Sequence, residues 1–112
     1  MKDRQQLYVA HVIECLDRID EYLPASKTEF LDDTMRQDAL IRALQVLAES
    51  TKRLSEDFKN SRPEVDWRAI AGLRNILVHE YLQVDLNEVW SIATRDLSQL
   101  RAAVEDELTS EP

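Results

Sequence analysis

A single glycine and three prolines in 112 residues leave this chain little material for tight turns between strands. The favoured hairpin turns place glycine or asparagine where φ is positive, and proline and glycine usually mark the ends of strands. Leucine, alanine, glutamate, arginine and glutamine are abundant instead, and all five are strong helix formers. The sequence therefore predicts an all-α fold.

Apolar residues recur at three- and four-residue spacing in four stretches, which predicts four amphipathic helices. These stretches cover roughly residues 4–22, 34–59, 63–81 and 85–105. Short connections between them predict an antiparallel four-helix bundle. The length suits one modest core, so we expect a single helical domain over residues 1–112.

The connector after the first helix holds its own helix signal. Ser26 and Glu29 form a capping-box pattern, which predicts a short extra helical turn near residues 27–32. We expect Phe30 and Leu31 on this turn to close over the core.

Other polar residues mark the starts of the later helices. Thr34 with Gln37 can cap the second helix, and Pro63 begins the third or lies just before its start. Asp85 is a good N-cap for the fourth helix, with Glu88 reaching back to it.

The second helix carries apolar residues at alternating spacings of four and three, which is a heptad-like seam. The seam consists of Leu40, Leu44, Leu47, Thr51, Leu54 and Phe58. Ile41 and Val46 widen the apolar surface beyond it. This width suits either the core of a bundle or contact with a second copy, and the sequence leaves both open.

Composition excludes several classes of protein. A net charge of −8 argues against a general nucleic-acid coat, whose affinity depends on many cations, but it is compatible with a small local phosphate site. Cys15 is the only cysteine, so this chain forms no intramolecular disulfide or cysteine-rich metal site, which suits a reducing compartment. The N-terminus lacks the apolar core of a signal peptide, and no apolar run approaches the roughly 18 residues of a membrane span. We expect a cytoplasmic protein without a membrane partner.

Residues 74–81 place three groups able to handle a phosphodiester close together. Arg74 is a permanent cation that can hold phosphate oxygens in a bidentate manner. His79 can give or take a proton near neutral pH, and Tyr81 offers a phenolic hydroxyl. Asn75 adds a polar amide directly after the arginine.

Helical geometry, at about 100° per residue, stacks Asn75 with His79 and aligns Arg74 with Tyr81. Arg74 and His79 lie about 140° apart around the axis. The long arginine stem, a bend near the helix end or a second subunit would have to close this gap, and we expect a site at a subunit seam. By spacing alone, a histidine near a helix C-terminus and a packed tyrosine explain the same residues.

Gly72 is the only glycine and falls inside the third helix, where it should cost about 1 kcal/mol relative to alanine. Close packing of two helices is one explanation. An opening beside a site is the other, because Gly72, Asn75 and His79 share a face of the helix.

The run from Trp67 to Tyr81, followed by Val84-Asp85 and Val89-Trp90, closely resembles the HepT-like branch of the HEPN ribonucleases. These are toxins of bacterial and archaeal toxin–antitoxin pairs. The resemblance is most specific over residues 63–90 and is one of layout over the first two helices.

The signature of this branch, R-x(4)-H-x-Y with a polar residue after the arginine, is matched in full by Arg74, Asn75, His79 and Tyr81. One departure lies in the second helix, where Ala48-Glu49-Ser50 replaces the Gly-Glu-Ala associated with the family.

The resemblance implies an endoribonuclease that needs no metal or other cofactor and works as a homodimer with both motifs facing one cleft. Arg74 would stabilise charge on the scissile phosphate, and His79 would transfer the proton. Asn75 would orient His79 or bind phosphate. The implied substrate is RNA, either tRNA or mRNA, cut to leave a 2′,3′-cyclic phosphate and a 5′-hydroxyl.

Tyr81 has a further implied role. Toxins of this branch are paired with a minimal nucleotidyltransferase antitoxin of the MntA type, which transfers AMP to the motif tyrosine. AMPylation of Tyr81 would place negative charge and bulk beside Arg74, where RNA must bind.

Two other classes of function remain open at this point. A non-catalytic helical module could bind nucleotide or serve as the partner subunit of a nucleotidyltransferase; loss of Arg74 or His79 would have favoured it, and both are present. A plain dimeric scaffold is favoured by the acidic charge. In an RNA enzyme this acidic, several basic residues could supplement a small cleft, although each is more often a surface charge: Lys52, Arg53, Lys59, Arg62 and Arg68.

Overall fold

The structure is a computed structural model that describes residues 4–79 and 84–109, with only the backbone described over residues 74–79. Four longer helices are α1 (Arg4–Tyr22), α3 (Thr34–Thr51), α5 (Trp67–His79) and α7 (Ser98–Thr109). Shorter elements are α2 (Lys27–Leu31), α4 (Glu56–Asn60), α6 (Leu86–Ser91) and a π-helical stretch, η1 (Ile92–Asp96). These residues contain no strand, which confirms the all-α prediction.

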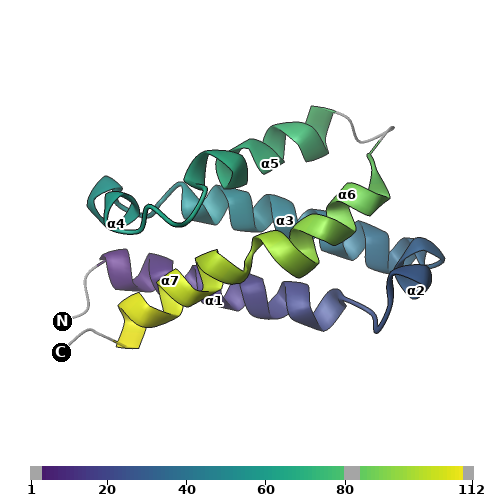
Figure 1. The fold of residues 1–112 in the computed structure, drawn as a ribbon, viewed down its shortest axis with the longest axis horizontal. Helices are drawn as coiled ribbons and strands as arrows, with labels where there is room; N and C mark the ends of the chain where they lie inside the picture. Colours follow the sequence, from purple (N-terminus) through teal and green to yellow (C-terminus); the bar gives the residue numbers. More distant parts are fainter. Residues whose placement is uncertain (1–3, 80–83, 110–112) are drawn as a thin grey trace.

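The helices form an antiparallel bundle (Figure 1). α3 lies between α1 and α5 and packs against both, so these three helices form a layer. The continuous run α6–η1–α7 crosses one face of that layer diagonally, and α7 packs on α1. The predicted four-helix bundle is confirmed, with this run in the place of the fourth helix. None of the helices in the described residues is long and apolar enough to cross a membrane.

The core follows the predicted seam. All six of its residues are buried, which confirms that this side of α3 and the segment after it face the interior. Phe30 of α2 is fully buried, and its ring centroid lies 5.6 Å from that of Trp90 on α6. The seam therefore serves the core of this chain, while Ile41 and Val46 beside it are only half-buried.

The short helix α2 forms where the capping pattern predicts it. Ser26 Oγ accepts a hydrogen bond from the backbone N–H of Glu29 at 3.2 Å. The predicted plug is half right, because Phe30 is buried whereas Leu31 is 40% exposed. Neighbouring residues on a helix point about 100° apart, so one of the two faces the core and the other faces out.

The predicted second helix over residues 34–59 is wrong beyond Thr51, where α3 ends and a turn leads into the separate helix α4. Ser55 begins this helix: its Oγ accepts from the N–H of Phe58 at 3.1 Å, and its own N–H donates to Gln5 Oε1 at 3.0 Å. Leu54 and Phe58 remain buried across the break, so the apolar pattern is satisfied without a continuous helix.

The start of α3 lies one residue from its predicted cap. Asp33, not Thr34, is the N-cap, and its carboxylate accepts from the N–H of Arg36 at 3.1 Å. Gln37 instead donates its side-chain N–H to the carbonyls of Phe30 and Leu31, at 3.0 and 3.1 Å. The predicted cap was wrong because a carboxylate one residue earlier reaches the same free N–H groups.

The third helix begins at Trp67 rather than near Pro63. Asp66 accepts from the N–H of Ala69 at 3.0 Å, as an N-cap residue does. The Trp67 indole donates to the carbonyls of Lys59 and Arg62, both at 3.1 Å, and so holds the preceding turn against α5.

Asp85 caps α6 as predicted, accepting from Asn87 and Glu88 at 2.9 and 3.4 Å. The fourth helix is not regular, because η1 interrupts it. The wider π-turn buries Ile92 together with Ala93, whereas the three- and four-residue spacing of the fourth helix predicted a buried stripe that includes Ala93 and not Ile92.

Candidate functional site

Three of the four motif residues lie on the last turns of α5: Arg74, Asn75 and His79. The helix is anchored at its other end by Asp66 and by the buried side chains of Ile70 and Leu73. The structure describes the backbone of residues 74–79 and not their side chains, and Tyr81 lies outside the described residues.

The helical backbone fixes how the motif residues are arranged around α5. The backbone places Asn75 and His79, four residues apart, on one side of the helix axis, with Arg74 about 140° around the axis from His79. This backbone agrees with the prediction that Asn75 and His79 share one face of the helix. The predicted meeting of the motif side chains, and their assigned roles, stay predictions.

The neighbour of the motif is the first half of α3. α5 runs antiparallel to α3, and the C-terminal end of α3 lies beside the start of α5 near α4 (Figure 1). At about 1.5 Å per residue, residues 74–79 run alongside roughly residues 39–44 of α3. A ligand held by the motif would therefore lie close to the surface that this part of α3 presents.

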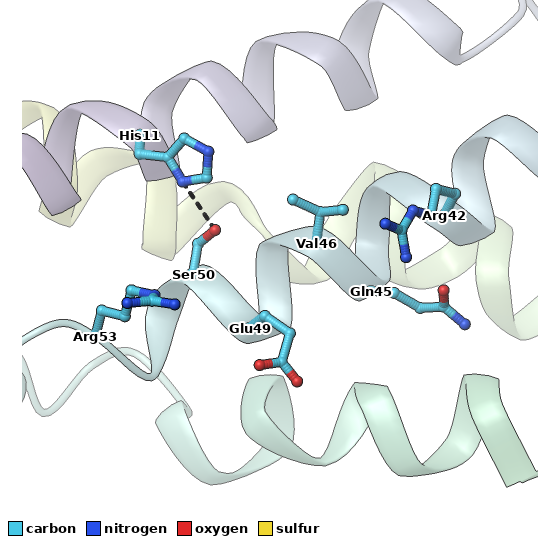
Figure 2. Close-up of a pocket in the computed structure, with 7 residues that line it drawn as sticks. All are labelled: His11, Arg42, Gln45, Val46, Glu49, Ser50 and Arg53. Atoms are coloured by element: carbon cyan, nitrogen blue, oxygen red, sulfur yellow. Dashed lines mark hydrogen bonds between the residues drawn. The ribbon is translucent and has the colours of Figure 1, made fainter.

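A hollow between α1 and α3, which we call the α1–α3 hollow, begins beside this part of α3 at Arg42, extends towards the end of α3 and has a volume of about 490 Å³. Seven residues line it, all drawn in Figure 2: His11, Arg42, Gln45, Val46, Glu49, Ser50 and Arg53. The hollow lies on the face of the three-helix layer opposite the α6–η1–α7 run (Figures 1 and 2).

His11 and Ser50 face each other across this hollow (Figure 2). Ser50 Oγ lies 2.9 Å from His11 Nδ1, and Ser50 is 5% exposed although His11 is exposed. Behind Ser50, its hydroxyl lies 3.7 Å from the Cys15 thiol sulfur. Burial raises the pKa of the Cys15 thiol, against weaker opposing effects of Ser50 and Arg18, so Cys15 contributes a neutral sulfur to this contact.

Sequence reasoning missed most of this hollow. Arg53 was only one of several basic residues considered, and His11 and Arg42 were not considered at all. The available signal was the helical spacing of residues 42, 46, 49 and 53, which places them on one side of α3 and its following turn. Ser50 is one of the two residues, with Ala48, at which the sequence departs from the Gly-Glu-Ala pattern.

The other basic residues considered do not line this hollow, although Lys52 pairs with one of its lining residues, Glu49. Lys52 pairs with Glu49 at 3.8 Å, Lys59 with Glu56 at 3.9 Å, and Arg62 with Asp106 at 2.7 Å. Arg68 is exposed near the start of α5.

Gly72 lines a second hollow, between α5 and the α6–η1 segment, with a volume of about 630 Å³. A Cβ built on Gly72 meets no atom within 4 Å among the described residues, so the close-packing explanation is wrong for this part of the chain. The charged residues lining this hollow are Glu64, Asp66, Glu88, Arg95 and Asp96. Four acids and one arginine make it unsuited to an anion. Among the side chains that the structure describes, no group of three metal-binding residues gathers anywhere.

Known proteins similar to this chain match it along most of its length. The profile of the family described as Ribonuclease HepT-like matches residues 12–107. A probable ribonuclease HepT of Thermococcus cleftensis is 34% identical over 106 residues, which cover 94% of this chain and 96% of that protein.

Two further relatives are more distant. A candidate RNase of Caldanaerobacter subterraneus subsp. tengcongensis is 30% identical over 105 residues, covering 93% of this chain and 94% of that protein. A Methanocaldococcus jannaschii protein described as gamma-glutamylcyclotransferase and candidate RNase is 30% identical over 106 residues, 93% of this chain but 47% of that protein. No solved structure matches the chain.

The helical bundle and the motif on α5 together define a domain of the HEPN type. The chain belongs to the HepT-like ribonuclease family, a class of RNA-cleaving enzymes, as its sequence motif indicated.

Proposed function

We propose that this chain is the toxin of a type VII-like toxin–antitoxin pair, a metal-independent endoribonuclease that cleaves tRNA or mRNA. The observation that supports it best is the family match over residues 12–107, which includes the complete R-x(4)-H-x-Y motif. The helix predicted to carry Arg74, Asn75 and His79 forms as α5 and packs against α3, which is consistent with the proposal.

In the proposed reaction the ribose 2′-oxygen attacks the adjacent phosphorus and the 5′-oxygen leaves. One proton is taken from the 2′-hydroxyl and one is given to the leaving oxygen, so the products are a 2′,3′-cyclic phosphate and a 5′-hydroxyl. His79 handles a proton, Arg74 holds the charge that builds up on the phosphate, and Asn75 orients His79 or binds phosphate.

We further propose that the active unit is a homodimer. Arg74 and His79 occupy positions about 140° apart around the axis of one helix, so a second copy that supplies one of the two groups would complete a cleft. This arrangement predicts that inactive Arg74→Ala and His79→Ala proteins regain part of the activity when they are mixed and allowed to exchange subunits.

The proposed partner is a minimal nucleotidyltransferase antitoxin of the MntA type. It would transfer the adenylyl group of ATP to the Tyr81 hydroxyl with release of pyrophosphate. The modified tyrosine, two residues beyond His79, would repel and block RNA at the motif. Co-production with such an enzyme should add the mass of AMP less one water to wild type and not to Tyr81→Phe.

The test of the ribonuclease compares wild type with Arg74→Ala and His79→Ala on total RNA in the presence of EDTA. Each substitution should lower the cleavage rate by about a hundredfold or more, because each removes a group that acts in the transition state. Arg68→Ala is the matched control, since Arg68 is an exposed arginine on the same helix. The product ends are analysed for 2′,3′-cyclic phosphate.

Wild type must be produced without the antitoxin, and its intact mass must show that Tyr81 is unmodified. Equal inactivity of all proteins under these conditions would reject the ribonuclease. It would favour the alternative function, a non-catalytic helical module that binds nucleotide or serves as a subunit of a nucleotidyltransferase.

A further inference from the structure

We propose that the α1–α3 hollow is a phosphate-binding site that takes a phosphate of the RNA strand beside the one that is cut. The proposal rests on the proposed ribonuclease function for the identity of the strand, and on the geometry of the hollow for the binding of phosphate.

The cations of the hollow are available to a ligand. Arg42 is exposed and makes no hydrogen bond or ion pair with the residues that the structure describes. The guanidinium carbon of Arg53 lies 5.9 Å from the centre of the Tyr8 ring, and stacking of this kind leaves the N–H edge of an arginine free to bind an anion. In a chain of net charge −8, two such arginines and a histidine around one hollow are an unusual local concentration of donors.

His11 is held in an orientation that suits a phosphate. Its Nδ1 is engaged by buried Ser50, so the other ring nitrogen, Nε2, is the one left for a ligand. If Ser50 donates to Nδ1, the neutral ring carries its proton on Nε2 and can donate it to an anion. A protonated ring donates from both nitrogens, and Ser50 then accepts. Nε2 is therefore a donor in both of these arrangements, whereas a neutral ring protonated on Nδ1 would donate to Ser50 and leave Nε2 an acceptor.

The one acid that lines the hollow does not oppose an anion strongly. Glu49 is turned away from His11 towards α5 (Figure 2), and its carboxylate pairs with Lys52 at 3.8 Å. A volume of about 490 Å³ falls within the roughly 300–1,000 Å³ of small-ligand sites.

The hollow is also correctly placed for a strand that crosses the motif. Arg42 lies on the part of α3 that runs alongside residues 74–79, and Arg53, in the turn after the end of α3, lines the other end of the hollow. A strand lying from α5 across α3 towards α1 would bring a neighbouring phosphate over the hollow.

The first experiment tests phosphate binding without any need for RNA cleavage. Inorganic phosphate is titrated into the full chain while the ring C–H signals of its two histidines, His11 and His79, are followed by NMR. The His11 signal should shift to saturation. Arg42→Ala should weaken this binding about tenfold and Arg42→Lys less, because a lysine keeps the charge but loses the bidentate geometry.

Two further variants identify which contacts matter. Ser50→Ala should weaken phosphate binding about threefold by freeing the His11 ring, with the fold retained by circular dichroism. Arg95→Ala is the matched control: it removes the same charge from η1, on the other side of the bundle, and should leave the titration unchanged. An absent His11 shift, or an equal effect of Arg95→Ala, would overturn the proposal.

The second experiment identifies the source of the phosphate. Binding of a single-stranded 2′-O-methyl RNA, which cannot be cut through its 2′-oxygen, should weaken about tenfold in Arg42→Ala and not in Arg95→Ala. If phosphate binds but Arg42→Ala leaves the affinity for RNA unchanged, the hollow binds a free phosphate compound and the RNA assignment is wrong. If Arg42→Ala instead changes the oligomeric state in light scattering and phosphate gives no shift, the hollow is a contact between copies.

These outcomes are separable from failure of the ribonuclease proposal. A wild type that binds phosphate and uncleavable RNA at this hollow but cuts no RNA would refute the nuclease and keep the phosphate site. A wild type that cuts RNA but shows no shift of the His11 signal with phosphate would refute the phosphate site and keep the nuclease.

Discussion

At position 72 the chain has a hydrogen atom where a methyl group would fit. Gly72 lies inside α5 without a positive φ, and a Cβ there meets nothing within 4 Å among the described residues. Alanine costs a helix less backbone entropy than glycine by about 1 kcal/mol. Gly72→Ala should therefore raise the free energy of unfolding by up to about 1 kcal/mol, measured by urea denaturation.

The matched control for this substitution is Ala69→Gly, at an exposed position one turn earlier on the same helix, which should lower stability by a similar amount. A loss of stability in Gly72→Ala would mean that a second copy, or a part of the chain outside the described residues, packs against this glycine. Retained stability with slower RNA cleavage would assign the space beside Gly72 to the site.

At the scale of the elements, one arginine of α7 forms ion pairs with two carboxylates of α1. Arg101 lies 3.0 Å from Asp17, 2.9 Å from Asp20 and 3.0 Å from Glu105. Partial burial disfavours its charge, but hydrogen bonds with Glu105 and Asp17 outweigh this and raise the pKa of the guanidinium. Without Arg101, three carboxylates would be left close together in a chain that is already acidic.

Arg101→Ala should lower the free energy of unfolding at pH 7 by about 1–2 kcal/mol, since it removes three pairs at a residue that is one-quarter exposed. The loss should shrink in 1 M NaCl, where the remaining carboxylates repel each other less. Arg95→Ala is the comparison, because Arg95 bonds to Ser91 on its own helix and should cost less than about 0.5 kcal/mol. Equal losses for the two variants would show that this network does not fasten α7.

The elements that the sequence predicted well are those whose signals are local. α1 has its predicted bounds, and the caps at Ser26 and Asp85 form as expected, because their side chains bond N–H groups two or three residues away. The end of α3 was not predictable in this way. There the N–H of Ser55 bonds to Gln5, fifty residues earlier in the chain, and a continuing heptad pattern conceals the break.

The same distinction applies to the candidate site. Three of the four motif residues, Arg74, Asn75 and His79, lie within one helix, so their placement on α5 followed from the sequence. The α1–α3 hollow did not, because His11 and Ser50 are 39 residues apart and meet only when α1 packs on α3. A lone exposed histidine gives no sign of its partner until the helices are placed.

For the whole molecule, the arrangement of charge decides how it can bind RNA. The net charge is −8, yet the two hollows differ in sign: acids dominate the one beside η1, whereas Arg42, Arg53 and His11 line the other. Long-range attraction to RNA is therefore weak, and binding must come from a few close phosphate contacts. We therefore expect the RNA strand to follow a narrow path over one face of the protein, from the motif on α5 to the α1–α3 hollow, and not to contact the protein on several sides.

This path sets the salt dependence of binding. A single-stranded nucleic acid loses about 0.7 in log K per unit log salt for each phosphate contacted. With two phosphates contacted, one at the motif and one at the α1–α3 hollow, an uncleavable RNA should give a slope of about −1.4, measured by fluorescence anisotropy. Arg42→Ala should make this slope shallower by about 0.7, and Arg95→Ala should leave it unchanged. A slope steeper than about −5 would mean that basic residues outside the hollow and the motif hold the strand, and the narrow path would be wrong.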